Sequence, residues 1–295
     1  MSKIISYCIF GEEQFYRRGL TKNIKLAAEL FPEWICRIYA ESTLDKNYLS
    51  SLERENTEII IKEKPTLPLD ALHWRWLPME EGHEAVIIRD VDTRLFQRDV
   101  NLVRDWLKNG KQYHVCRDHP GHKDPIMGGL WGGKYPKIEI KKLWDRYLRS
   151  NTKLISSHNK FANDQYFLSR YIYPLIRKNL TVYTEHNIFI FEEDVRRISG
   201  PRGTFEGRPV ILGVQPKQDF SEEDEQKRKE YFKSDYLKNE ERRIHMSMTS
   251  EEMGSESPVI NVSLPPFLFS NIFGRLFYGA MKILIGILKY KLKVL

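Results

Sequence analysis

The chain has 295 residues, of which 41% are hydrophobic and 29% are charged. This balance is typical of a globular protein that is long enough to bury a full core. The formal net charge is +7, but five of the cationic residues lie in the last 25 residues, which contain no acidic residue, so only +2 is left for everything before them. The charge pattern therefore argues against a nucleic-acid partner.

Three cysteines, Cys8, Cys36 and Cys116, are widely spaced and form no Cys-x-x-Cys pair. They predict neither a zinc site nor a redox site, and a reducing compartment is the simplest interpretation. The apolar stretch at 4–10 is followed at once by two glutamates, so it is too short for the core of a signal peptide. We expect it to form the first strand.

Apolar runs and helical spacings alternate along the first half of the chain. Strands are expected at 3–10, 34–39, 57–61, 85–89 and 112–116, and helices at 14–31, 69–77 and 100–107. This alternation is typical of an α/β fold, in which helices flank the sheet and ligands collect at the carboxyl ends of the strands. We expect an α/β domain over 1–215, a charged helix and flexible linker over 216–257, and a basic tail over 258–295.

The segment 84–94, EAVIIRDVDTR, has a short apolar run that ends at Asp90 and Asp92. Two positions apart on an extended segment, both carboxylates project the same way. They can share Mn²⁺ or Mg²⁺, which takes one or two protein carboxylates and keeps its other positions for water and substrate phosphates. Arg89 and Arg94 add donors for a phosphate. The alternative is an Asp-rich strand end with surface ion pairs.

Several groups suited to acid/base chemistry or ligand binding gather in the loop HVCRDHPGHKD at 114–124. They are Arg117, Asp118, His119, His122 and Asp124. The two imidazoles are candidates for binding a metal or a phosphate, or for proton transfer. The alternative is that they only hydrogen-bond the backbone of the loop.

Two further segments carry candidate site residues. Residues 126–134, IMGGLWGGK, place four glycines around Trp131 in a pattern that is neither a dinucleotide fingerprint nor a P-loop. Glycines permit tight turns and close backbone approach, and the Trp131 ring offers a face for a sugar, unless it is a core residue. Asp164 opens a helix expected to run to about Tyr173, either as a carboxylate that faces the substrate or as a helix cap.

The stretch 271–293 has a basic and small-residue stripe if it is helical. The stripe consists of Asn271, Arg275, Gly279, Lys282, Gly286, Lys289 and Lys293. A wide apolar face beside such a stripe suits a helix that lies in a bilayer interface, whereas Lys282 in mid-segment argues against a span. We expect peripheral association with the anionic cytoplasmic face of a membrane. The alternative is that the helix docks on the protein's own core.

Five motifs, in this order and spacing, carry a resemblance to a known family. They are HWRWLP at 73–78, RDVDTR at 89–94, HVCRDHPGH at 114–122, IMGGLWG at 126–132 and NDQYFL at 163–168. Together they resemble the GT-A-type nucleotide-sugar glycosyltransferases of bacterial surface-polysaccharide clusters and large viruses, over about residues 3–215. The resemblance implies a GT-A-like, Rossmann-related mixed sheet flanked by helices, to which the sequence adds the C-terminal amphipathic helix.

The resemblance also implies roles for single residues. Asp90 and Asp92 match the Asp-x-Asp motif, which implies Mn²⁺ or Mg²⁺ on the donor diphosphate, and His186 is a possible third ligand although its usual surrounding pattern is missing. Asp164 matches an acidic position near the transferred sugar, and the GGLWG segment is similar to an acceptor-side glycine element, so acceptor binding is expected of Gly128, Gly129, Trp131 and Gln165. From the residues themselves, Arg89, Arg94 or Arg117 is expected to add positive charge at the donor, and Tyr7 belongs to the segment 7–10 at the end of the first strand, where the nucleotide base is expected.

The expected activity is metal-dependent, hexosyltransferase-like transfer of a sugar from a nucleotide diphosphate sugar to a hydroxyl of a glycan or a lipid-linked acceptor. If the reaction inverts the anomeric centre, Asp164 or His119 is the candidate base; if it retains the configuration, Asp164 would stabilise the oxocarbenium-like state. A HAD-type phosphatase is disfavoured because Thr93 comes one position early for its motif. A catalytically inactive, membrane-tethered carbohydrate-binding protein is the other alternative.

Overall fold

A computed structural model describes residues 2–66, 68–119, 121–150, 163–189, 192–200, 202, 204–205, 208–209, 211–213 and 261–263. Its main feature is a sheet with the strand order β3-β2-β1-β4-β6-β5-β7-β9. The strands are β1 (Lys3–Ile9), β2 (Trp34–Glu41), β3 (Thr57–Lys62), β4 (Ala85–Ile88), β5 (Tyr113–Arg117), β6 (Trp131–Lys134), β7 (Leu180–Thr184) and β9 (Asp194–Arg196). The expected α/β class and the five expected strands are confirmed.

The sheet is mixed because one inner strand runs against the others. β6 pairs antiparallel with β4 and with β5, whereas the other recorded pairs in this sheet are parallel. The segment that precedes β6 therefore lies at the same edge as the segments that follow β4, β5 and β7. That edge is where an open α/β sheet binds its ligands.

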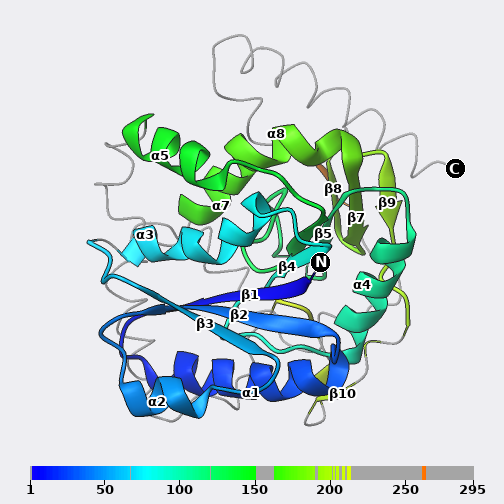
Figure 1. Cartoon of the computed structure of the whole chain (residues 1–295). Helices are drawn as coiled ribbons and strands as arrows, with labels where there is room; N and C mark the ends of the chain where they lie inside the picture. Colours follow the sequence, from blue (N-terminus) through cyan, green and yellow to red (C-terminus); the bar gives the residue numbers. More distant parts are fainter. Residues whose placement is uncertain are drawn as a thin grey trace, which may run out of the picture.

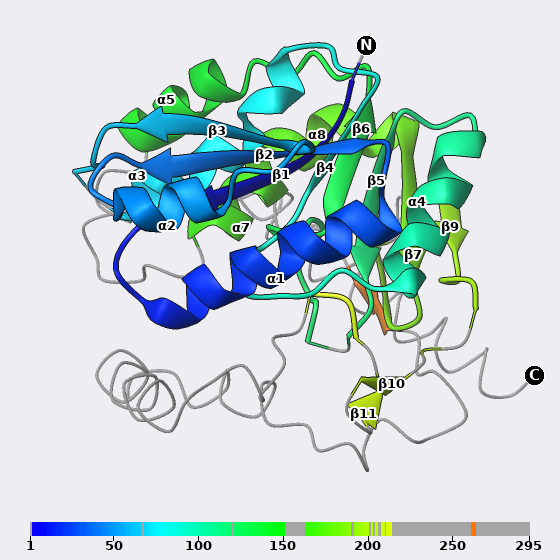
Figure 2. The ribbon, with the colours of Figure 1, turned by 60° about the horizontal axis from the view of Figure 1, so that its bottom comes forward.

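Helices cover both faces of the sheet (Figure 1). Figure 2 shows α1 and α2 together on one face. The helices are α1 (Gln14–Leu30), α2 (Lys46–Ser51), α3 (Pro68–Leu72), α4 (Gln97–Lys108), α5 (Ile140–Ser150), α7 (Asn163–Phe167) and α8 (Tyr173–Ile176), with 3-10 turns at η1 (His73–Glu80) and η3 (Arg177–Asn179) and a π-helical turn at η2 (Leu168–Ile172). The helices expected at 14–31, 69–77 and 100–107 are thus found, the second mostly as a 3-10 helix.

The hydrophobic core has two large parts, one on each face of the sheet. β4 contributes to both, because its side chains alternate: Ala85 and Ile87 pack with α1 and α4, whereas Val86 and Ile88 pack with η1, α5 and α7. All four residues are fully buried. A strand buried on both faces is thereby fixed in register, and it holds the start of the following segment in place.

Aromatic packing anchors η1 and α7 to each other on the second face. The Trp76 ring stacks on Phe167 with the centroids 5.3 Å apart, and Trp144 of α5 meets both rings edge-on. These contacts fix the backbone next to Arg75 and next to Asp164. The two residues therefore come from segments that are far apart in the sequence but rigidly joined by the core.

Two short additional sheets lie outside the main one. β10 (Thr204–Phe205) pairs antiparallel with β11 (Arg208–Pro209), and β12 (Asn261–Ser263) pairs parallel with β8 (Asn187–Phe189). The second pairing joins the C-terminal part of the chain to the segment that follows β7. Among the described residues, none of the helices has the length and apolar character to cross a membrane. The predicted amphipathic helix at 271–293 lies outside the described residues.

Candidate functional site

Most of the motifs singled out in the sequence meet at the carboxyl edge of the sheet. Asp90 and Asp92 follow β4, the histidine-containing loop follows β5, and Glu185 and His186 follow β7. The Gly128–Gly129 turn enters the same edge ahead of β6. The convergence follows from the parallel course of β4, β5 and β7 and the reversed course of β6.

At the centre of this edge, Arg75 joins two carboxylates. Its Nη1 donates to Oδ1 of Asp90, and its Nη2 donates to Oδ2 of Asp164 over 3.3 Å. The Arg75 residue is only 6% exposed, while the side chains of Asp90 and Asp164 are 30% and 13% exposed. Asp92 also acts electrostatically on the guanidinium. Arg75 thus links the Asp-x-Asp motif to the acidic residue of α7.

Asp164 sits in the first turn of α7, where the backbone N–H of Gln165 donates to its Oδ1 over 2.8 Å. Burial raises the pKa of this carboxyl to about 6, although Arg75 lowers it; Asp90 and Asp124 raise it further. A carboxyl with a pKa near 6 can accept a proton at neutral pH and is a stronger base than an ordinary aspartate. The placement of Asp164 near a reacting group stays a prediction, and its contact with the Gln165 N–H is a local interaction in the first turn of α7.

The two glycines of the turn are required by close packing against these carboxylates. A Cβ added at Gly128 would lie 2.8 Å from both Nη2 of Arg75 and Oδ2 of Asp164. A Cβ at Gly129 would lie 2.2 Å from Oδ2 of Asp90, and real Cβ contacts essentially never fall below 3.0 Å. The turn therefore forms one wall of the carboxylate pair, which gives these glycines a structural reason besides the predicted contact with an acceptor.

Gly129→Ala should displace the Asp90 carboxylate and lower the rate of the expected sugar transfer at least about 10-fold. A displacement of about 1 Å in the groups that position a substrate can lower the rate by about two orders of magnitude. Gly110→Ala is the matched control, since a Cβ at Gly110 meets nothing within 4 Å. Both variants should be compared by turnover and by melting temperature. Equal activity in the two variants would contradict the role of the turn.

The predicted donor-binding role is wrong for two arginines, Arg89 and Arg117, because each is already paired with a buried carboxylate. Arg89 donates twice to Asp99 of α4, over 2.9 Å and 2.7 Å, and is 3% exposed. Arg117 is fully buried, donates to both carboxylate oxygens of Glu192 over 2.6 Å, and packs over Phe189. Each arginine neutralises an acid of another element, which holds α4 and the segment after β8 to the sheet.

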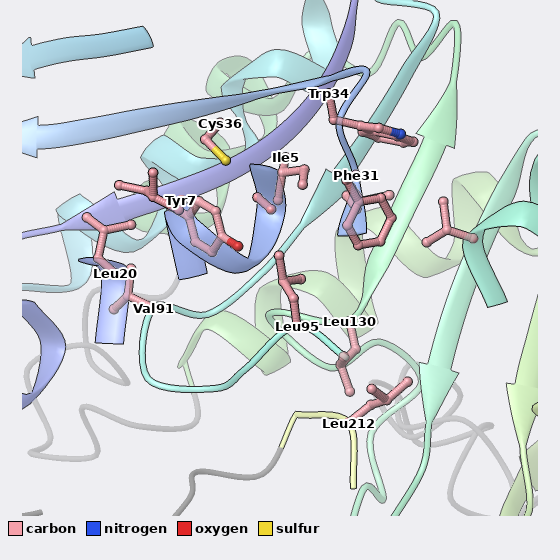
Figure 3. Packing of buried hydrophobic residues seen from close by; sticks show 14 of the residues in the cluster. Ile5, Tyr7, Leu20, Phe31, Trp34, Cys36, Val91, Leu95, Leu130 and Leu212 are labelled. Carbon is pink, nitrogen blue, oxygen red and sulfur yellow. The ribbon is translucent and has the colours of Figure 1, made fainter. Parts of the chain in front are cut away.

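Arg94 and Tyr7 are also buried rather than open to a donor. The Arg94 Nη1 donates to the carbonyl oxygens of Thr93 and Val91, so its charge stabilises the turn after the Asp-x-Asp motif. Figure 3 shows the Tyr7 ring within the apolar cluster on the α1 face of the sheet. Tyr7 points this way because alternate side chains of β1 face opposite sides, so it is a core residue rather than a contact for a base.

Trp131 is a core residue and offers no face to a sugar ring. It is 0% exposed and belongs to the cluster on the second face of the sheet. Its position in β6 directs it away from the edge, because side chains of a strand stand perpendicular to the sheet. The prediction of acceptor stacking on Trp131 is therefore wrong, and its core alternative is confirmed.

The histidines gather near the ends of β5 and β7. The rings of His119 and His122 lie 5.6 Å apart, and Nδ1 of His119 accepts from the backbone N–H of Gly121. Burial lowers the pKa of His122 to about 3, assisted by His119, His186 and Arg117. His122 is thus held neutral over the physiological pH range.

An ion-pair network surrounds His186 and makes its neighbourhood a poor place for a cation. Arg98 pairs with Asp118 and Glu185, and Arg202 pairs with the same two acids. The nearby arginines contribute to a lowered pKa for His186, after the larger effect of burial. The described residues contain no group of three or more His, Cys, Asp or Glu side chains able to hold a metal ion. The structure thus gives no support for His186 as the third ligand.

The Asp pair nevertheless fits a cation that shares its coordination with substrate. Asp90, Asp92 and Asp164 carry three negative charges when ionised, and Arg75 offsets one, so one divalent cation balances the rest. Mg²⁺ and Mn²⁺ accept such carboxylate oxygens and take the remaining ligands from phosphate and water. Asp90 and Asp92 are the residues that would hold it.

Arg75 is the functional residue that reasoning from the sequence missed. It lies in the HWRWLP motif, but nothing in that local pattern distinguishes it from a surface arginine. Asp124 was expected only as one of several acid/base groups in the loop 114–124, and its charge contributes to the raised pKa of Asp164. Arg75 and Asp164 lie 89 positions apart in the sequence, so their contact could not be read from a local pattern.

No family model and no curated protein matches the chain. Among solved structures, it is similar to a glycosyltransferase involved in the glycosylation of the major capsid of PBCV-1 (16% identity, 64% of this chain and 85% of that chain, TM-score 0.41). It is also similar to a mannosyltransferase from Pyrobaculum calidifontis in complex with GDP-Man and Mn²⁺ (13% identity, 74% of this chain but only 57% of that chain, TM-score 0.40). Such low identities and TM-scores do not assign an activity, so the chemistry of the site has to support it.

Proposed function

We propose that this protein is a glycosyltransferase, hexosyltransferase-like, that moves a sugar from a nucleotide diphosphate sugar to a hydroxyl group of a glycan or a lipid-linked acceptor, with Mn²⁺ or Mg²⁺ as cofactor. The supporting observation is the junction of Arg75 with Asp90 and Asp164 at the carboxyl edge of the sheet. In it, the Asp90 carboxylate, which is the proposed cation ligand, and the Asp164 carboxyl with its raised pKa lie on either side of one guanidinium.

The two carboxylates would serve the two ends of the donor. A divalent cation held by Asp90 and Asp92 supplies charge stabilisation for the departing diphosphate. Asp164, which the Arg75 guanidinium separates from Asp90, would lie near the sugar. It would take the proton of the acceptor hydroxyl if the reaction inverts the anomeric centre, or stabilise positive charge on the sugar ring if the configuration is retained.

The experiment is a panel of nucleotide diphosphate sugars tested with and without Mn²⁺, read by melting temperature and by release of the nucleoside diphosphate. A ligand that binds only the folded state raises the melting temperature. We expect one class of donor to raise it only when Mn²⁺ is present, and to be consumed slowly by water. Hydrolysis of p-nitrophenyl phosphate without any donor effect would instead support a phosphatase, and donor binding without any turnover would support an inactive binder.

We further propose peripheral association with the cytoplasmic face of a membrane through 271–293, on the sequence evidence of its basic stripe and apolar positions. The pairing of β12 with β8 matters for testing this proposal. A deletion that begins before β12 would remove part of the folded protein together with the tail. A deletion of 264–295 keeps the pairing.

Removal of 264–295 should abolish co-sedimentation with liposomes that contain anionic lipids, while the melting temperature stays near that of the full chain. Neutral liposomes serve as the control, because the attraction of each lysine requires anionic headgroups. Co-sedimentation by the shortened chain at the level of the full chain would contradict the membrane role of the tail.

A further inference from the structure

The Asp90 carboxylate has a close neighbour at each of its two oxygens. Its Oδ1 accepts from Nη1 of Arg75, and its Oδ2 is packed against Gly129, where an added Cβ would lie at 2.2 Å. A cation that binds Asp90 has to reach a carboxylate that already has a positively charged partner. The ion pair between Arg75 and Asp90 therefore has to be weakened when a cation binds Asp90, which lowers the affinity for the cation.

We propose that Arg75 is a positioning residue that holds Asp90 and Asp164 together and competes with a divalent cation for Asp90. The proposal rests on the proposed function for the identity of the cation site. Only a planar guanidinium with two separate N–H groups can span the two carboxylates, since a lysine ammonium is a single point charge.

The contacts of Arg75 indicate what happens when the cation arrives. The Arg75 Nη2 donates to Asp164, and its Cζ lies 5.8 Å from the centroid of the Trp76 ring. These two contacts would hold the guanidinium in position if a cation displaced Nη1 from Asp90. Two positive charges close to one carboxylate repel each other strongly in a partly buried site. Arg75 should therefore weaken cation binding while it keeps Asp90 and Asp164 in their relative positions.

The test measures the affinity for Mn²⁺ alone, by titration of free Mn²⁺ with electron paramagnetic resonance, in wild type, Arg75→Gln and Arg75→Lys. Arg37→Gln is the matched control. Arg37 is a buried arginine of β2 that also bridges two acids, Glu58 and Glu81, over 2.7 Å and 2.5 Å. Its loss should lower stability in the same way without touching the Asp90 site.

We expect Arg75→Gln to bind Mn²⁺ about 10-fold more tightly than wild type, because a repelling charge and a competitor are removed. Arg75→Lys should bind it more tightly than wild type but by a smaller factor, and it carries the test if Arg75→Gln does not fold. Arg37→Gln should leave the affinity unchanged. A purely structural role for Arg75 predicts lower stability with unchanged or weaker Mn²⁺ binding, and that result in the Arg75 variants overturns the proposal.

The outcome is separable from that of the proposed function. Tighter Mn²⁺ binding by the Arg75 variants, with no sugar transfer from any donor, would support the competition between Arg75 and the cation and would contradict the proposed glycosyltransferase function. Transfer that depends on Mn²⁺, with unchanged affinity in the Arg75 variants, would do the reverse.

Discussion

Replacement of Asp164 by asparagine should lower kcat by about 10²- to 10⁴-fold, the usual contribution of a positioned acid or base. Asparagine keeps the shape of the side chain but can neither take a proton nor carry a negative charge, so both possible roles of Asp164 are lost. The donor KM should change little, because the donor's cation is held by other residues. The measurement is steady-state transfer or donor hydrolysis, with the melting temperature as a check on folding.

The pH dependence adds a second readout for Asp164. If its ionised form takes the acceptor proton, the wild-type rate should rise with pH through about 6, and Asp124→Asn should shift this rise to lower pH by removing a charge that raises the pKa of Asp164. A rate that is flat between pH 5 and 8 would contradict a base of this pKa.

The stability of the protein should also depend on pH through Asp164. Because its folded-state pKa lies above the unfolded value, the contribution of this group to the free energy of unfolding is present below about pH 4 and lost as the pH rises through 6. Asp164→Asn should remove that loss.

The local pattern was sufficient to predict strands whose two faces are both buried. The fully apolar run of β4 and the helical spacing of α1 gave their positions to within a few residues. β6 was not predicted as a strand, since its sequence WGGK has no strand pattern. Its glycines are explained only by long-range packing, because a Cβ at Gly132 would lie 2.6 Å from the ring of His114 and 2.5 Å from the carbonyl oxygen of Val86.

The same division between local and long-range information applies to the site. Asp90 could be placed at the carboxyl edge of the sheet from the sequence because it follows the expected strand at 85–89. Asp164 and the glycine turn were joined to it only through the resemblance that the five motifs carry. The partners of the arginines could not be predicted in either way. An arginine beside an aspartate looks the same in sequence whether its partner is a phosphate or a buried acid, and Glu192, the partner of Arg117, lies 75 positions away.

Asp92→Asn should abolish the Mn²⁺-dependent binding of a nucleotide diphosphate sugar while leaving the protein folded. The substitution removes one of two negative charges that would hold the cation, with almost no change in volume. Asp92 is half-buried. The check is the thermal shift caused by donor plus Mn²⁺, which should disappear in the variant; unchanged Mn²⁺-dependent donor affinity would contradict the assignment of Asp92 to the metal.

Asp90→Asn is the matched comparison, because the two aspartates differ in their contact with Arg75. Both variants should lose the Mn²⁺ effect on donor binding, but Asp90→Asn also weakens a charged hydrogen bond to a buried guanidinium. Such bonds contribute about 1.5–3 kcal/mol, so its free energy of unfolding should fall by roughly that amount relative to wild type. The melting temperature of Asp90→Asn without metal therefore tests the Arg75 bridge, and the response of both variants to Mn²⁺ tests the cation site. Unchanged stability of Asp90→Asn would mean that Arg75 does not hold Asp90 in solution.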